Sequence, residues 1–280
     1  MLKAPPCSFP VRTCFMSFLQ LLIIAIVQGV TEFLPISSSG HLILIPKLMD
    51  FPDQGPLIDV AVHVGTLAAI VSYFWRDVWG LARGGFASVG IGTAPAERRL
   101  FWYIMAGTVP AVLVGLFLKT GGYLEGFRST TLVAINLIVY GVLLGIADRF
   151  GAQRKSFEEL TLKDAVIVGL AQALALIPGT SRSGVTMTAA RFLGYSRFES
   201  ARFSFLLSIP AIAGAGLLAV LDLADASARM QSDAITAGAL TFVAAILTMV
   251  FLMNFLKRAS MMVFVVYRVA MGVALLLFFA

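Results

Sequence analysis

Two polar segments interrupt a chain that is otherwise rich in apolar residues. The first reads PISSSG over residues 35–40, and the second reads PGTSRSG over residues 178–184. Glycines let the backbone turn tightly and bring its N–H groups close to an anion, and a helix that starts there points its positive end at the same place. Arg182 adds a rigid guanidinium fork that suits phosphate oxygens. The second segment therefore predicts a phosphate site.

The residues expected to bind phosphate surround Arg182 and extend to the serines of the first segment. They are Gly179, Thr180, Ser181, Ser183 and Thr186, with Ser37 and Ser39 from the first segment. No lysine follows the second glycine, so the pattern is not the nucleotide loop GxxxxGK[ST].

The first segment contributes an acid, a hydroxyl and a histidine. Glu32 lies four residues after Gln28, so both side chains share one face of a helix. A carboxylate in such an apolar setting is costly unless it is paired, solvated or bound to metal. Ser38 and His41 follow. If the two segments meet, these groups face Arg182 and supply a nucleophile, a base or metal ligand, and a cation, which are the components of phosphoryl transfer.

The composition indicates whether these segments lie in water or in a lipid bilayer. Hydrophobic residues make up 59% of the chain, charged residues 13%, and the mean hydropathy is +0.91, whereas soluble domains carry about 25% charged residues. We therefore predict a single all-α membrane domain. The net charge of +6 fits membrane topology, and no nucleic-acid partner is expected. Cys7 and Cys14 form neither a disulfide framework nor a zinc site.

Six apolar runs are long enough to cross roughly 30 Å of hydrocarbon, which takes about 20 residues. They lie near residues 57–75, 101–118, 131–148, 201–221, 234–256 and 261–279. Two further segments, 17–48 and 160–195, contain the polar breaks. We interpret each as a re-entrant helix, loop and helix, because non-helical backbone at membrane depth survives only where protein or a watery cavity satisfies it. The alternative is a proline-kinked ordinary span.

The two broken segments resemble each other at an offset of 144 residues. We therefore predict a duplicated unit of one re-entrant pair and three spans, with repeat 1 at about 16–148 and repeat 2 at about 160–280. Because three is odd, the second copy is inverted, a design typical of transporter folds. Residues 1–15 are interpreted as an N-terminal extension rather than a signal peptide, because the apolar run leads directly into the first break.

Lysine and arginine are distributed unevenly between the two predicted faces, with thirteen on one and six on the other. The richer face is expected to be cytoplasmic. Both termini and the first re-entrant pair then open to the outside. The richer face holds Arg76, Arg83, Arg98, Arg99, Arg149, Arg154, Lys155, Lys163, Arg191, Arg197, Arg202, Lys257 and Arg258.

The strings QGVTEFLPISSSGH, AQALALIPGTSRSGVT and FSFLLSIPAIAGAG resemble the signatures of the bacterial undecaprenyl-diphosphate phosphatase (bacitracin-resistance) family. The resemblance extends over nearly the whole chain beyond about residue 15. It implies hydrolysis of undecaprenyl diphosphate to undecaprenyl phosphate and phosphate, which recycles the carrier lipid of cell-wall synthesis. It also implies an inner-membrane location, an outward-facing site and a divalent cation, Mg²⁺ or Ca²⁺. A homodimer is possible.

By this resemblance Glu32 is the second acid of the family's [E/Q]xxxE motif, with Gln28 at the first position, which departs from members with Glu but stays within the family's pattern. We assign Ser38 as nucleophile, Arg182 as phosphate clamp and His41 as proton shuttle, with Glu32 and Gln28 as the expected metal ligands. Attack by water or by His41 uses the same residues and stays open. The alternative function is a polyprenyl-phosphate transporter or flippase.

Three further kinds of polar or aromatic residue lie outside this assignment. His63 is expected to be a packed or hydrogen-bonded histidine, and Arg268 to pair within the helix bundle, with Asp148 as a candidate partner. Trp75, Trp79 and Trp102 lie near span ends and are expected to anchor at the membrane interface.

Overall fold

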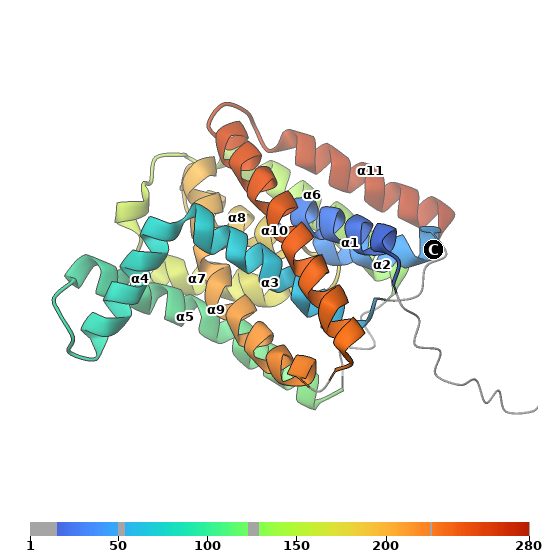
Figure 1. Cartoon of the computed structure of the whole chain (residues 1–280). Helices are drawn as coiled ribbons and strands as arrows, with labels where there is room; N and C mark the ends of the chain where they lie inside the picture. Colours follow the sequence, from blue (N-terminus) through green and yellow to red (C-terminus); the bar gives the residue numbers. More distant parts are fainter. Residues whose placement is uncertain (1–15, 50–53, 123–128, 225, 280) are drawn as a thin grey trace, which may run out of the picture.

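The computed structural model describes residues 16–49, 54–122, 129–224 and 226–279. Within these ranges the backbone is almost entirely helical, which confirms the predicted all-α fold (Figure 1). The predicted extension 1–15 lies outside the described residues. The helices are α1 (Phe18–Thr31), α2 (Ser38–Met49), α3 (Gly55–Tyr73), α4 (Trp75–Ser88), α5 (Pro95–Thr120), α6 (Thr130–Phe150), the 3-10 helix η2 (Phe157–Glu159), α7 (Leu162–Leu174), α8 (Arg182–Phe192), α9 (Arg197–Ala224), α10 (Ala228–Leu256) and α11 (Met262–Phe278).

The long helices coincide with the predicted spans. Among the described residues, α3, α5, α6 and α10 are long and apolar enough to cross a membrane. The other two predicted spans correspond to α9, with 28 residues, and α11, with 17. Several separate apolar helices of this kind define a multi-pass membrane protein.

Both broken segments form two short helices joined by a turn, as predicted. α1 and α2 flank the first break, and α7 and α8 flank the second. The first helix of each pair starts with a capping box, in which Ser17 pairs with Gln20 and Thr161 with Asp164. Ser17 and Thr161 are 144 residues apart, so the caps lie at equivalent positions of the repeat.

Helix contacts follow the same correspondence. α1 packs against α10, and its counterpart α7 packs against α5, while α6 packs against α11. Glycines permit the close approach. A Cβ on Gly29 would lie 2.7 Å from the Ala244 Cβ in the first contact, and one on Gly107 would lie 2.8 Å from the Ala165 carbonyl oxygen in the second. These matched contacts are those expected of a duplicated unit. The orientation of its halves in the membrane stays a prediction.

α4 has no counterpart in the second half and was not predicted. It has 14 residues, too few to cross a bilayer, and it packs against α5. Figure 1 shows it at the opposite end of the molecule from α2. Trp75 and Trp79 on this helix are exposed, as expected for anchors at a membrane interface.

Candidate active site

The two breaks meet inside the helix bundle, as the repeat predicts. Arg182 Nη2 lies 2.6 Å from Glu32 Oε1, which joins the start of α8 to the end of α1. Ser183 Oγ donates to the carbonyl oxygen of Leu34 at 3.2 Å. Residues about 150 positions apart in sequence therefore form one polar centre.

Glu32 is the hub of this centre. Its side chain is 6% exposed, and its second oxygen, Oε2, accepts from Ser38 Oγ at 2.7 Å and from Gln28 Nε2 at 3.1 Å. His63 Nε2 lies 3.8 Å from the same oxygen. The arginine and the two further donors compensate the burial of this carboxylate. The Ser38 hydroxyl thus donates its hydrogen bond to a strong acceptor.

The two breaks share an unusual backbone conformation. Ser37 and Ser181 have φ angles of 75° and 71°, a left-handed region that non-glycine residues seldom occupy. Each hydroxyl caps the helix that follows, accepting from the N–H of Gly40 at 3.4 Å and of Gly184 at 3.1 Å. The strained serines aim the first turns of α2 and α8, which begin with Ser38 and Arg182, at the same centre.

A cavity of about 380 Å³ opens beside this centre. Of the residues predicted from sequence, five line it: Glu32, Ser38, Ser39, Ser181 and Arg182. The remaining wall consists of Asp59, Val60, His63, Ala111, Gln172, Ala175, Leu176, Ala211 and Ile212. A small charged patch is thus surrounded by mainly apolar side chains.

The other predicted residues lie behind or beside the cavity wall. Gln28 is fully buried against Glu32. Thr186 Oγ1 bonds the Arg182 carbonyl oxygen at 2.7 Å and Ser204 Oγ at 2.6 Å. These contacts fix α8 rather than present a group to a ligand. Ser37, Gly179 and Thr180 belong to the turns and Ser183 to the start of α8, and these four residues are likewise not part of the wall.

His41 lies away from Glu32 and Ser38, whereas His63 lies beside Glu32. His41 has both ring nitrogens engaged, Nδ1 with the Ser37 carbonyl oxygen at 2.7 Å and Nε2 with the Tyr267 hydroxyl at 2.6 Å, and it lines a separate pocket. His63 lines the cavity with Glu32. Its Nδ1 is 2.6 Å from the Asp59 carbonyl oxygen, so Nδ1 carries the proton and Nε2 faces Glu32. The bond to Asp59 agrees with the expected hydrogen-bonded histidine, and His63 in addition forms part of the cavity wall.

Arg268 does not pair with Asp148, which corrects the suggested partner. Its guanidinium is fully buried and donates to carbonyl oxygens on three elements, including Pro35 at 3.2 Å and Gly179 and Thr180 at 2.9 Å each. These carbonyl oxygens lie at the two breaks, where the helical hydrogen-bond pattern is interrupted. Arg268 therefore fastens both turns together.

Asp148 lies in a separate ionic cluster. It accepts from Arg197 at 2.6 and 3.1 Å and from the Met261 N–H at 3.0 Å, with Arg191 Nε 3.6 Å away. The α6 end is thereby tied to the starts of α9 and α11, outside the cavity.

Sequence reasoning gave no role to two polar residues of the wall, Asp59 and Gln172. Gln172 lies in the second broken segment. Its position, 144 residues after Gln28, was the available signal, since duplicated segments that meet bring equivalent positions to one site.

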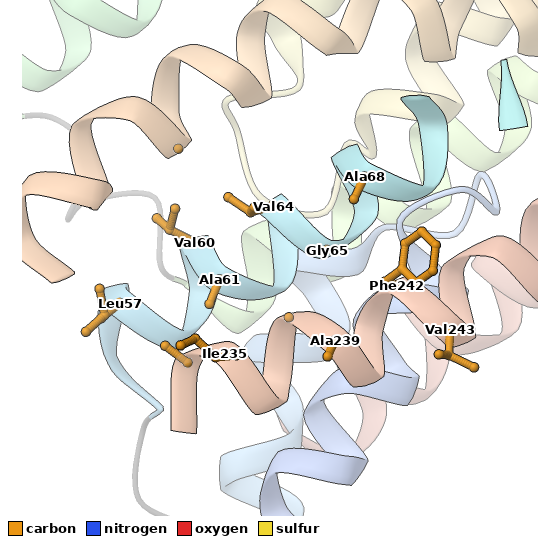
Figure 2. Close-up of a pocket in the computed structure, with 13 residues that line it drawn as sticks. Leu57, Val60, Ala61, Val64, Gly65, Ala68, Ile235, Ala239, Phe242 and Val243 are labelled. Carbon is orange, nitrogen blue, oxygen red and sulfur yellow. The ribbon is translucent and has the colours of Figure 1, made fainter. Parts of the chain in front are cut away.

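An apolar groove of about 520 Å³ lies next to the polar cavity. Figure 2 shows its walls on α3 and α10, where small side chains such as Ala61, Ala68 and Ala239 leave room between larger ones such as Phe242. Val60 lines both the groove and the cavity. A ligand with a charged head and an apolar tail has matching surfaces on the two sides of this residue.

Comparison with known proteins gives consistent relatives. The model of the family described as bacitracin resistance protein BacA matches residues 21–274. The chain is 65% identical to the undecaprenyl-diphosphatase of Erythrobacter litoralis over 285 residues, covering 94% of this chain and all of the relative. It is 48% identical to the undecaprenyl-diphosphatases of Ruegeria pomeroyi and Hahella chejuensis, each alignment covering 93% of this chain and 98% of the relative. The chain therefore belongs to the bacitracin resistance protein BacA family.

Proposed function

We propose that this protein hydrolyses undecaprenyl diphosphate to undecaprenyl phosphate and inorganic phosphate, which returns the carrier lipid to cell-wall synthesis. The observation that carries the proposal is the contact of Glu32 with Ser38 and Arg182 on the wall of one cavity. This set combines a hydroxyl nucleophile, its base and an anion clamp. The names of the relatives support the same reaction, and none of these relatives is named as a transporter.

Ser38 is the proposed nucleophile. Its Oγ attacks the terminal phosphorus while the proton passes to Glu32 Oε2, 2.7 Å away. The bond from that phosphorus to the bridging oxygen breaks, undecaprenyl phosphate leaves, and water then cleaves the phosphoserine to free phosphate. Arg182 stabilises the charge on the transferred oxygens. Direct attack by water would use the same clamp and base.

His41 receives no support as proton shuttle from these contacts. Both of its ring nitrogens are bonded to Ser37 and Tyr267 rather than to Glu32 or Ser38. His63 is the histidine that approaches the carboxylate.

The donor set fits a divalent cation that is shared with the substrate. Within the described residues, no three His, Cys, Asp or Glu side chains converge on one point. Magnesium is commonly held by one or two carboxylates together with substrate phosphates, and Glu32 and Asp59 both line the cavity. Gln28 Oε1 is buried without a partner, but Gln28 lies behind Glu32. Bound Mg²⁺ or Ca²⁺ would neutralise charge on the phosphoryl oxygens.

The polyprenyl chain is proposed to lie in the apolar groove beyond Val60. The groove is lined by apolar residues of α3, α9 and α10, and Leu57 to Ala68 along α3 spans about 16 Å at the α-helical rise. A diphosphate in the polar cavity would direct its first prenyl units past Val60. Substrate would then enter sideways from the lipid.

We place the protein in the bacterial inner membrane, with both termini and the site on the outer side. The excess of lysine and arginine on the opposite face supports this orientation. A homodimer stays a prediction.

The deciding experiment is phosphate release from undecaprenyl diphosphate by the purified protein in detergent with Mg²⁺ or Ca²⁺. We expect turnover that is lost in Glu32→Ala and Arg182→Ala. Normal turnover in either variant would refute the site. No release by the unmodified protein, together with lipid translocation in vesicles, would favour the transporter instead.

A further inference from the structure

Gln172 has no partner for its side-chain amide although it is buried. It lies on α7, near the end of the helix, and is 3% exposed. Neither Oε1 nor Nε2 has a hydrogen-bond partner, yet the residue lines the cavity that holds Glu32 and Arg182. Buried polar groups are nearly always satisfied in folded proteins. An unsatisfied amide at a cavity wall is best explained by a ligand that satisfies it.

The repeat explains why this amide is left open. Gln28, at the equivalent position, donates to Glu32 one helical turn later. Four residues after Gln172 the chain has Leu176 instead of an acid, and Leu176 lines the same cavity. The duplication thus kept the glutamine and lost its partner within the helix.

Arg182 has a matching open group. Its Nη2 is bonded to Glu32, but its Nη1 is buried without a partner. Two unsatisfied donors, a guanidinium nitrogen and an amide nitrogen, therefore belong to side chains of one cavity. Donors of this kind next to an arginine suit an anion with several oxygens.

We propose that Gln172 is a substrate-binding residue whose amide donates to an oxygen of the diphosphate held by Arg182. The proposal rests on the proposed function, because that function supplies the diphosphate. It assigns to α7 a direct contact with the headgroup, in addition to those from α1, α2 and α8. The site would then draw on all four short helices around the breaks.

The test compares Gln172→Leu with Thr241→Val. Thr241 Oγ1 is also buried without a partner but lies outside the cavity, where α3 packs on α10. Either change removes an unsatisfied polar group, so melting temperature should stay equal or rise in both. We expect kcat/KM for a prenyl diphosphate to fall about 10- to 100-fold in Gln172→Leu, the range for losing a hydrogen bond to a charged group, and to be unchanged in Thr241→Val.

A second measurement separates binding from turnover. The dissociation constant of inorganic diphosphate is measured by calorimetry on the full-length protein, and we expect it to rise by a similar factor in Gln172→Leu. Gln172→Glu has the same size and should weaken binding further, because its carboxylate repels the anion. If Gln172→Leu does not fold, Gln172→Glu alone decides.

Unchanged kcat/KM and unchanged diphosphate affinity in these variants would overturn the role of Gln172. Failure of the unmodified protein to release phosphate would instead count against the proposed function. In that event the ratio of diphosphate affinities still decides whether Gln172 binds the anion.

Discussion

At the scale of single residues, the site depends on one carboxylate that several donors share. Glu32 holds Arg182 with one oxygen and Ser38 and Gln28 with the other. The same group thus orients the proposed nucleophile and the phosphate clamp. Its charge balances the guanidinium, so chemistry and stability are linked at this position.

We expect Glu32→Gln to lose activity at least about 100-fold, because the amide cannot take the Ser38 proton. The variant should also unfold at lower temperature, because removing one partner of a buried pair leaves an uncompensated charge. Adding Arg182→Met should restore the melting temperature but not phosphate release. Thermal unfolding in detergent and the phosphate assay check both parts, and an active Glu32→Gln enzyme would contradict the assignment of the base.

Cation dependence provides a second test at the residue scale. Chelation with EDTA should abolish phosphate release, and added Mg²⁺ or Ca²⁺ should restore it. Asp59→Asn should raise the cation concentration for half-maximal activity about 10-fold, as expected for losing one charged ligand contact. The control is Asp233→Asn, since Asp233 pairs with Arg229 on α10 outside the cavity. Equal cation titrations for the two variants would exclude Asp59 as a ligand.

At the scale of elements, the fold depends on how the broken helices are held. Each break frees backbone carbonyls that lipid cannot satisfy. Arg268 from α11 donates to carbonyls of both breaks and of α6. A single guanidinium therefore sets the distance between the two turns.

Arg268→Met should destabilise the protein strongly and abolish activity, because each carbonyl left without a donor costs about 1–3 kcal/mol. Arg268→Lys should recover part of the stability, since an ammonium has three donors and cannot reach all the same carbonyls. Melting temperature in detergent and phosphate release are the measurements. Arg258→Met, at an exposed position after α10, is the matched control and should resemble the unmodified protein.

At the scale of the whole molecule, the polar cavity and the apolar groove form adjoining surfaces that meet at Val60. The charged site lies between the two halves, while the groove opens between α3, α9 and α10. The two surfaces share Val60 alone, although α3 and α9 contribute residues to both. They should respond separately to mutation.

Ala239→Phe should narrow the groove without touching the site, because this exposed residue lines only the groove. We expect KM for undecaprenyl diphosphate to rise several-fold, because the binding free energy lost is roughly the transfer free energy of one or two CH₂ groups. A short prenyl diphosphate should be hydrolysed as before. Leu247→Phe, an exposed position on the same helix, is the control. Equal effects on long and short substrates would place the tail elsewhere.

The sequence predicted the spans well because apolar length is a local property. The meeting of Glu32 and Arg182 was predicted on the condition that the inverted repeat brings both breaks together, and the two side chains are in contact. The sequence did not predict α4, which is amphipathic and short. The placement of His41 and His63 depended on side-chain direction within the bundle, which spacing from the Ser-rich break does not determine.

The predicted partner of Arg268 was wrong for a different physical reason. Asp148 was the suggested partner of Arg268 because a sequence gives the types of the side chains and does not show which backbone carbonyls lack a hydrogen-bond partner. The true acceptors are backbone carbonyl oxygens, three of them at the two breaks and two in α6. Likewise, the open amide of Gln172 becomes apparent only when its neighbours are known.

The matching left-handed serines precede different chemical groups in the two halves. Ser37 and Ser181 give both halves the same frame, but the next residue is Ser38 in one and Arg182 in the other. An identical pair of units would place two hydroxyls or two guanidiniums at the junction. The acid and nucleophile on one side and the cation on the other therefore require two halves of different sequence. Neither half alone can assemble the ion pair of Glu32 and Arg182. Joining the two halves in one chain therefore fixes their ratio at one to one.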